Sequence, residues 1–344
     1  MSGIRFYTQV MRKQKQQPLA DAVAVVAGAT RGAGRGIARA LGEAGAIVYC
    51  TGRSVRGNPS PYGRAETIEE TAEMIVAEGG RAVAIRVDHT VETEVAALFK
   101  RINDEHGRLD VLINSIAGED PMMAQWASFW KIDFSNAEAI LRQALLSHVI
   151  TAKHGAPLMI GKRRGLIVEV TENDLLLAGG NILTQTVKFS QKALATIYAA
   201  ELRKHGVAAV AITPGFLRSE TMLEHFGVTE ENWRDAGKKD RNFLESESPL
   251  FVGRAVVALA ADPGILDRSG QLFSSWEVGR EYGLTDADGR RPDWGALDID
   301  YSQLPASFME EFRDALQVQS EWLKVLSSRT ERFRNSFLEK TTAA

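Results

Sequence analysis

The chain has 344 residues, 44% hydrophobic and 25% charged, a composition ordinary for a globular protein that is long enough to bury a substantial core. Its 41 basic and 44 acidic side chains leave a formal net charge of −3, so no overall charge draws it to nucleic acid or to anionic membranes, and we expect a small-molecule substrate. The single cysteine, Cys50, excludes an internal disulfide and a thiolate metal cluster and indicates a reducing compartment, the cytoplasm, while the absence of any run of 18 apolar residues excludes a bilayer span.

The N-terminal residues 1–18 contain the basic cluster MRKQKQQP but no continuous apolar stretch of the kind that a secretory signal needs. We expect a loosely ordered arm here.

From Asp21 onwards, short β-branched runs alternate with longer helical patterns, which predicts βαβ units around a parallel sheet. Several runs are apolar almost throughout, as is typical of strands that helices cover on both faces. The helical pattern around residues 194–202 ends in a basic turn and Gly206, which can take the left-handed cap. The fold class is therefore α/β, a doubly wound parallel sheet of Rossmann type over residues 19–285. The expected strands are 22–29, 46–52, 82–88, 109–115, 165–171, 207–215 and 270–275.

Residues 286–344 form a C-terminal extension that is turn-like at first and then, over 307–338, has a helical pattern rich in charge and aromatics. Its apolar side chains could pack on the main domain or on a second subunit, and the sequence leaves both alternatives open. These side chains are Phe308, Phe312, Leu316, Trp322 and Leu326.

A glycine-rich turn, GATRGAG, follows the first expected strand and precedes a helical stretch. Gly28, Gly32 and Gly34 would let the backbone approach a phosphate, and the free amides and dipole of the helix would attract its charge. Thr30, inside the turn, is a further expected contact. The spacing G-x-x-x-G-x-G differs from G-x-G-x-x-G, but its position after the first strand of an alternating chain predicts a dinucleotide site.

The end of the second expected strand indicates which dinucleotide binds. A carboxylate there would hold the ribose 2′-hydroxyl of NAD, whereas an arginine accepts the 2′-phosphate of NADP. This chain has TGRS, with Arg53 and Ser54 and no acid, and Arg31 in the glycine turn adds a second cation. We therefore favour NADP(H); the alternative is two solvated surface arginines.

At these positions the chain resembles the short-chain dehydrogenase/reductase family over roughly residues 19–282, as a divergent member that lacks the family's serine and tyrosine catalytic pair. The resemblance implies cofactor contacts, with Asp88 at the adenine, Lys188 at the nicotinamide ribose and Ser219 near the carboxamide. Residues 269–292 also resemble the tail of relatives of dehydrogenase/reductase member 1. The matching positions beyond the glycines are Asp88, Asn114 in NSIAG, Lys188, Pro214, Gly215 and Ser219.

The resemblance also locates the catalytic positions, where this chain departs from the family. In the family a tyrosine four residues before the lysine protonates the substrate, a serine after the fifth strand binds the substrate oxygen, and an asparagine in the preceding helix supports a water relay. Here Thr184 stands for the tyrosine, and Glu172 with Thr171 beside it stands for the serine. Ala144 stands for the asparagine, and Ala27 replaces a threonine before the first glycine.

These departures affect proton transfer. The hydroxyl of Thr184 is a far weaker acid than a phenol and is several ångströms shorter, so we do not expect it to donate the proton. Glu172 could replace it if an apolar pocket keeps the carboxyl protonated. An ion pair with Lys188 would instead keep it charged and give it a structural role, and both alternatives stay open.

Four other polar residues lie near these positions in the sequence, and for each we expect a structural role. Asn173 and Asp174 could add polar contacts but are typical of a turn. His148 and His154 lie in the long helical pattern before the fifth expected strand, and we expect packed or surface histidines, with His148 the better candidate for a general acid.

The sequence thus predicts an NADP(H)-dependent oxidoreductase that transfers hydride to a C=O, C=N or C=C bond of a small molecule. Its catalytic positions are Lys188, Glu172 and Thr184, and the proton comes from Glu172, from water or from the substrate itself. Two alternatives remain: a cofactor-binding protein without redox turnover, and a non-redox lyase or isomerase that uses the same pocket. A homo-oligomer is expected from the family resemblance.

Overall fold

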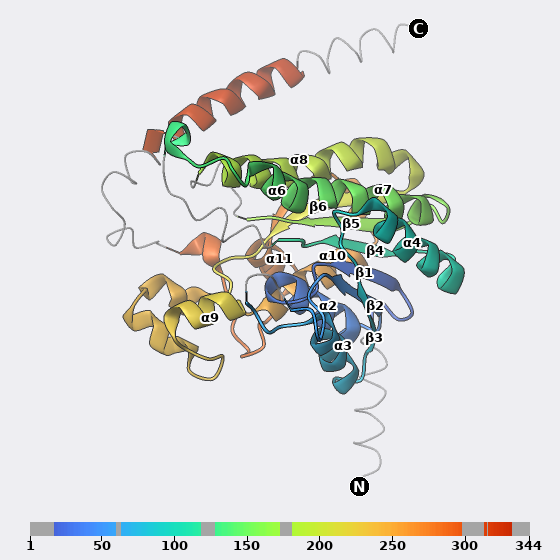
Figure 1. The fold of residues 1–344 in the computed structure, drawn as a ribbon. Helices are drawn as coiled ribbons and strands as arrows, with labels where there is room; N and C mark the ends of the chain where they lie inside the picture. Colours follow the sequence, from blue (N-terminus) through green and yellow to red (C-terminus); the bar gives the residue numbers. More distant parts are fainter. Residues whose placement is uncertain are drawn as a thin grey trace, which may run out of the picture.

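The computed structural model describes residues 17–59, 63–117, 128–172, 181–297, 313–314 and 316–331. A seven-stranded sheet with the order β3-β2-β1-β4-β5-β6-β7 forms its centre, and every neighbouring pair of strands is parallel (Figure 1). All seven expected strands form, somewhat shorter than their apolar runs. They are β1 (Val23–Ala27), β2 (Ile47–Gly52), β3 (Arg81–Arg86), β4 (Val111–Asn114), β5 (Gly165–Val170), β6 (Val207–Thr213) and β7 (Leu272–Ser274).

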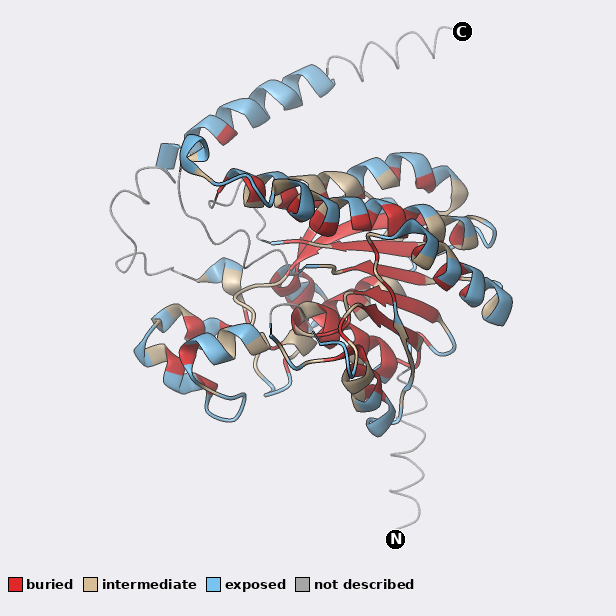
Figure 2. Ribbon diagram, in the orientation of Figure 1, coloured by how far each residue is buried: buried red, intermediate tan, exposed pale blue. Residues whose placement is uncertain are grey.

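Helices cover both faces of the sheet because successive side chains of each strand point to opposite sides. On one face Val26 packs in a core with Ile37 and Val252, and on the other Val25 packs with Phe99 and Met159. Figure 2 shows the strands as an almost continuous buried layer between helices that are exposed on their outer sides. The first face carries α2 (Gly32–Glu43), α3 (Ile68–Ala77) and α10 (Pro249–Ala261); the second carries α4 (Glu92–His106), α7 (Ser147–Ile160) and α8 (Ile182–Leu202).

Shorter elements complete the chain. The helix α8 is closed by a 3-10 turn and by Gly206, whose φ of 75° is the expected left-handed cap. Among the helices that the structure describes, none is both long and apolar enough to cross a membrane. The shorter elements are η1 (Phe129–Lys131), α6 (Ala137–Leu141), the π-helical turn η2 (Arg142–Leu146), η3 (Arg203–His205), η6 (Ile265–Arg268), α11 (Ser275–Tyr282) and η7 (Trp294–Ala296).

The strand order reverses at β1, which lies between β2 and β4. In open sheets of this kind, ligands bind outside the carboxyl ends of the strands at this reversal point. The register pairs Ala27 with Asn114, so the glycine turn and the NSIAG segment leave the sheet side by side. The topology therefore places the candidate cofactor residues at one edge.

An outer lobe, residues 216–247, stands beyond the carboxyl end of β6 and is visible beside the sheet in Figure 1. It has a small hydrophobic core of its own around Phe226, Trp233 and Phe243. The helix α9 (Glu220–Phe226) begins it, and the 3-10 turns η4 (Trp233–Lys238) and η5 (Arg241–Glu245) follow.

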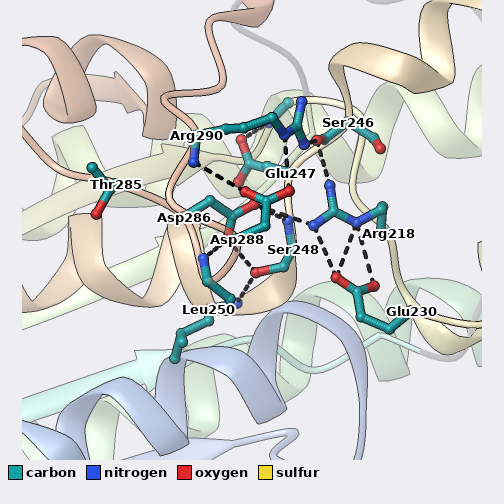
Figure 3. A network of polar contacts seen from close by, with 12 residues as sticks. Arg218, Glu230, Ser246, Glu247, Ser248, Leu250, Thr285, Asp286, Asp288 and Arg290 are labelled. Carbon is teal, nitrogen blue, oxygen red and sulfur yellow. Dashed lines mark hydrogen bonds and ion pairs between the residues drawn. The ribbon is translucent and has the colours of Figure 1, made fainter. Parts of the chain in front are cut away.

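A buried arginine fixes the outer lobe to the C-terminal part of the main domain (Figure 3). Arg218 is 1% exposed, and its guanidinium donates to the carbonyl of Ser246 at 2.6 Å. The same group pairs with Glu230 at 2.9 Å and with the fully buried Asp286 at 3.3 Å. Asp286 also accepts the backbone amide of Ser248 at 2.8 Å. The lobe is therefore held by charge as well as by its small core.

Within the C-terminal extension, residues 316–331 are helical, as the sequence predicts. The ring of Trp322 lies 6.2 Å from that of Phe189 in α8, so one side of this helix contacts the main domain. Leu316 and Leu326 are each more than one third exposed. Phe308 and Phe312, like residues 1–16 of the N-terminal arm, lie outside the described residues.

Candidate functional site

The glycine turn is tightly packed at the reversal point of the sheet. Gly28 has a φ of +90°, and a Cβ there would lie 2.3 Å from the carbonyl oxygen of Ser115. A Cβ on Gly34 would lie 2.0 Å from the carbonyl oxygen of Gly28. Side chains at either position would push the turn, the start of α2 and the end of β4 apart. The glycines thus bring the N-terminus of α2 to the edge where a ligand would bind.

This N-terminus already holds an anion, the carboxylate of Glu220 from the outer lobe. The amide of Gly32 donates to Glu220 Oε2 at 2.7 Å, and Arg35 Nη1 lies 3.3 Å from Glu220 Oε1. Arg35 is anchored in turn by the carbonyl of Thr30, which its Nε reaches at 3.0 Å. A helix amide with a fixed guanidinium beside it suits a phosphate, so the residues present fit the diphosphate of a dinucleotide.

The end of β2 presents a guanidinium beside the end of β3. Arg53 donates to Gln143 Oε1 at 2.7 Å, and its other terminal nitrogen lies 3.9 Å from Asp88 Oδ2. The Arg53 side chain is 36% exposed, so a ligand can reach it. Arg31 occupies the N-cap position of α2 and is partly exposed, whereas Ser54 is buried. The structure thus brings two predicted cofactor residues, Arg53 and Asp88, into one group.

The carboxylate of Asp88 is well suited to remain ionised. Burial by itself would raise its pKa, but hydrogen bonds from the amide and hydroxyl of Thr90, together with the charge of Arg53, lower the pKa below its ordinary value. A charged acceptor is therefore available at the end of β3.

A fully buried polar network lies behind the NSIAG segment. Asn114 Nδ2 donates to Glu169 Oε1 at 2.6 Å, and Glu169 Oε2 lies 2.6 Å from His148 Nδ1. The other ring nitrogen of His148 is 3.1 Å from the carbonyl oxygen of Ile116. Both nitrogens thus contact protein groups, which makes His148 a packed residue that orients the segment. Asn114, the first residue of NSIAG, holds the segment to this network through its bond to Glu169.

The other candidate histidine, His154, lies away from this network. His154 lies on the outer face of α7, 3.0 Å from the exposed carboxylate of Glu92. In the described part of the chain, no group of three or more histidine, cysteine, aspartate or glutamate side chains could hold a metal ion.

Lys188 lies on α8, facing the end of β5. Its Nζ is 3.7 Å from Glu172 Oε2, and its side chain is 12% exposed, whereas that of Glu172 is 65% exposed. Thr171 donates its hydroxyl to the carbonyl oxygen of Lys188 at 3.2 Å. Glu172 therefore has solvent and an ammonium around it, the surroundings that the ion-pair alternative requires. Asn173 and Asp174 lie outside the described residues.

Thr184 belongs to the first turn of α8, which begins at Ile182. Asn181 caps this helix: its Oδ1 accepts the amide of Thr184 at 3.0 Å and the Thr184 hydroxyl at 3.3 Å. The hydroxyl at the family's tyrosine position is thus engaged in capping.

The position expected for the family's asparagine lies in an irregular part of the long helix. Ala144 is buried inside the π-helical turn η2, and its carbonyl oxygen accepts from Gln191 at 3.0 Å. Gln143, in the same turn, donates to the carbonyl of Ala117 at 2.9 Å. π-Helical turns are frequent at functional sites. At the position of the family's asparagine, Gln143 and Gln191 therefore make side-chain hydrogen bonds to the backbone.

The end of β6 closes the site on the side of the outer lobe. Pro214 and Gly215 follow the strand, and the amide of Gly215 donates to Glu247 Oε2 at 3.0 Å. Complete burial raises the pKa of Glu247 to about 8. Ser219 caps α9, and a Cβ on Gly32 would lie 3.7 Å from the Cβ of Ser219. Ser219 thus faces the glycine turn across the edge of the sheet.

Four residues of this site do not follow from the predicted motifs: Arg35, Gln143, Glu220 and Glu247. Arg35 and Glu220 each stand one position beyond a predicted residue, which is the one signal that the sequence offers for them. Gln143 stands one position before Ala144, whereas Glu247 is not adjacent to any predicted residue.

Comparisons with known proteins identify the family of the chain. A family model described as short chain dehydrogenase matches residues 22–227. The mouse protein named Dehydrogenase/reductase SDR family member 1 is 38% identical over 278 residues, 79% of this chain and 85% of its own length, and the human protein of that name is 36% identical over 277 residues, again 79% and 85%.

Solved structures show the same architecture. A metagenomic short-chain oxidoreductase in complex with NADP has a TM-score of 0.56 at 25% identity and covers 74% of this chain and 97% of its own. The hydroxysteroid dehydrogenase from Escherichia coli has a TM-score of 0.60 at 21% identity, over 76% of this chain and 97% of its own, which supports the fold alone.

Proposed function

Because the chain belongs to the short-chain dehydrogenase family, a family of oxidoreductases, we propose that it transfers hydride between NADP(H) and a C=O, C=N or C=C bond of a small molecule. The observation that carries this proposal is the anion-holding N-terminus of α2 at the reversal point of the sheet. With the diphosphate of the cofactor held at this N-terminus, its nicotinamide would supply the hydride.

The preference for NADP(H) rests on Arg53. It stands at the end of β2 with no acid beside it in TGRS, and its guanidinium is partly exposed. A planar guanidinium can bind a phosphate through two hydrogen bonds, and Arg31 would add to the positive potential. The NADP complex of the metagenomic relative is consistent with this preference.

The remaining roles follow from position. Lys188 would hold the nicotinamide ribose. Asp88 would contact the adenine, and Asn114 would support the NSIAG segment behind the nicotinamide. Thr184 is too weak an acid to protonate a carbonyl oxygen, and its hydroxyl is occupied by Asn181. We infer that the proton comes from water, with the exposed Glu172 as its relay, or from the substrate.

A substrate that brings its own proton would need no tyrosine. An iminium nitrogen is already protonated, so hydride delivery alone completes the reduction. Imines are therefore the first substrates to test, beside the ketones that a family member would ordinarily reduce.

A second candidate function is a cofactor-binding protein without redox turnover. The ion pair between Glu172 and Lys188 and the capping role of Thr184 favour it, because both give the catalytic positions a structural use. A non-redox lyase or isomerase, with Glu172 as base, would use the same pocket. We also propose a cytoplasmic homo-oligomer; the exposed Val149 and Ile197 on α7 and α8 are consistent with an interface, which a mass measurement in solution would test.

The deciding experiment follows NADPH oxidation at the nicotinamide absorbance with matched pairs of ketones and imines, after NADPH binding has been measured. Turnover of the imine alone would mean that the substrate supplies the proton. If the substrate supplies the proton, Glu172→Gln should leave the rate of NADPH oxidation unchanged. If Glu172 relays the proton from water, the same substitution should lower this rate by about tenfold or more. Thr184→Tyr, beside Lys188, should restore some ketone reduction. Tight NADPH binding without turnover of any ketone or imine would refute reduction of C=O and C=N bonds and favour the non-redox candidates.

A further inference from the structure

The carboxylate on the N-terminus of α2 comes from an element that is distant in sequence. Glu220 is the first residue of α9, 188 positions beyond Gly32, and Ser219 fixes the start of α9 by accepting the amide of Met222. The contact therefore joins the glycine turn to the outer lobe across the edge where the cofactor site is proposed.

The site that receives this carboxylate is rigid. Arg35 is 8% exposed, and besides the carbonyl of Thr30 it reaches the hydroxyl of Thr71 at 3.1 Å and the carboxylate of Glu70 at 2.7 Å. Its Nη1 remains directed to Glu220. An always charged guanidinium, held in place from three sides, and a helix amide together make a fixed site for one anion.

We propose that Glu220 takes the place of a cofactor phosphate in the free protein and is displaced when the cofactor binds, so that a residue of the outer lobe sets cofactor affinity. This inference rests on the proposed function. The amide of Gly32 cannot donate fully to a phosphate and to Glu220 at once, and two anions at one helix terminus repel each other. The affinity measured for the cofactor is therefore reduced by the fraction of protein in which Glu220 occupies the site.

The same displacement links the two parts of the protein. Once Glu220 leaves, Arg35 Nη1 is directed at the phosphate, and α9 loses its charged contact with the main domain. The cofactor would thus loosen α9 at the moment when it fills the site, while the network of Arg218 keeps the rest of the outer lobe attached.

A matched control lies one turn further along α9. Glu224 is also an acidic residue of this helix and pairs with Arg64 at 2.7 Å, but its side chain is 73% exposed. Glu224→Gln removes the same charge from the same helix without touching the glycine turn, whereas Glu220→Gln keeps the shape of the side chain and Glu220→Ala removes it.

The test measures binding by calorimetry for three probes: NADPH, inorganic pyrophosphate, and 2′-AMP, which has the 2′-phosphate but no diphosphate. Glu220→Gln and Glu220→Ala should each tighten NADPH and pyrophosphate binding about tenfold, since a charge-assisted contact no longer competes, and should leave 2′-AMP unchanged. Glu224→Gln should change none of the three. Unchanged or weaker NADPH binding by both Glu220 variants would overturn this inference alone, and failure of the unaltered chain to bind NADPH or NADH would overturn the proposed function with it.

Discussion

Replacement of Arg218 by methionine should destabilise the protein strongly, because it removes the cation from a buried network. The methionine side chain fills much of the same volume and is apolar, so the change removes charge more than packing. Asp286, which is fully buried, would lose the guanidinium 3.3 Å away while still accepting the amide of Ser248. An uncompensated carboxylate would remain in the interior.

The magnitude follows from what each partner can do after the change. Removing one member of a buried ion pair costs about 3 to 5 kcal/mol. Glu230 is 46% exposed and can be hydrated, and the carbonyl of Ser246 still accepts from Arg290 at 2.8 Å. The cost is therefore concentrated in Asp286, and we expect the lower end of the range, about 3 kcal/mol.

Arg234→Met is the matched control for Arg218→Met. Both guanidinium carbons lie over the ring of Trp233, at 4.2 Å for Arg218 and 4.5 Å for Arg234. Arg234, however, is 59% exposed, and its partner Asp288 lies 3.5 Å away at the surface, so its loss should cost less than about 1 kcal/mol.

Urea unfolding measures both variants, with far-UV circular dichroism for the sheet and helices and tryptophan fluorescence to include the outer lobe. A lower midpoint at constant slope gives the change in the free energy of unfolding. Equal losses in the two variants, or a loss below about 1 kcal/mol for Arg218→Met, would refute the claim that the buried pair with Asp286 holds the lobe.

Two further predictions concern the edge of the sheet. Burial raises the pKa of Glu247 to about 8 from an ordinary 4.5, so the folded chain keeps a proton that the unfolded chain releases between these values, and this carboxyl lowers stability as pH rises from 4.5 to 8. Glu247→Gln should therefore raise the melting temperature at pH 8 and change it little at pH 4.5; an equal effect at both pH values would contradict the shift. Gly34→Ala places a Cβ 2.0 Å from the carbonyl oxygen of Gly28 and should cost at least about 1 to 3 kcal/mol and abolish NADPH binding. Gly161→Ala, whose nearest neighbour would be 3.5 Å away, should change neither, and similar melting temperatures of the two variants would contradict the argument.

Apolar runs and glycine spacing were sufficient to predict the sheet. Except for the partly exposed edge strand β3, the runs are largely buried on both faces, which gives the same residue pattern in any parallel sheet, and the glycine turn follows the first of them. Thr184 could be related to Lys188 only through the resemblance to the family, and the structure places both on one helix, α8.

The contacts that make the site particular to this chain could not be predicted. Glu220 reaches Gly32 across 188 positions, and Arg218 reaches Asp286 across 68. Nothing in the local sequence distinguishes these acidic and basic residues from solvated ones, because burial and partner are set by how distant elements pack. The burial of Glu247 could not be predicted either, because it also depends on the packing of distant elements. Single charged residues near a motif become informative only once the fold is known.

The distance in sequence between Arg218 and Asp286 also bears on synthesis of the chain. During translation Arg218 leaves the ribosome 68 residues before its buried partner Asp286, whereas its other partner, Glu230, follows after 12. At about 5 to 20 residues per second, the delay before Asp286 lasts roughly 3 to 14 seconds. Throughout that interval Arg218 can pair with Glu230 inside the outer lobe but not with Asp286, so in a nascent chain interrupted before residue 286 the lobe lacks this buried charged link to the main domain.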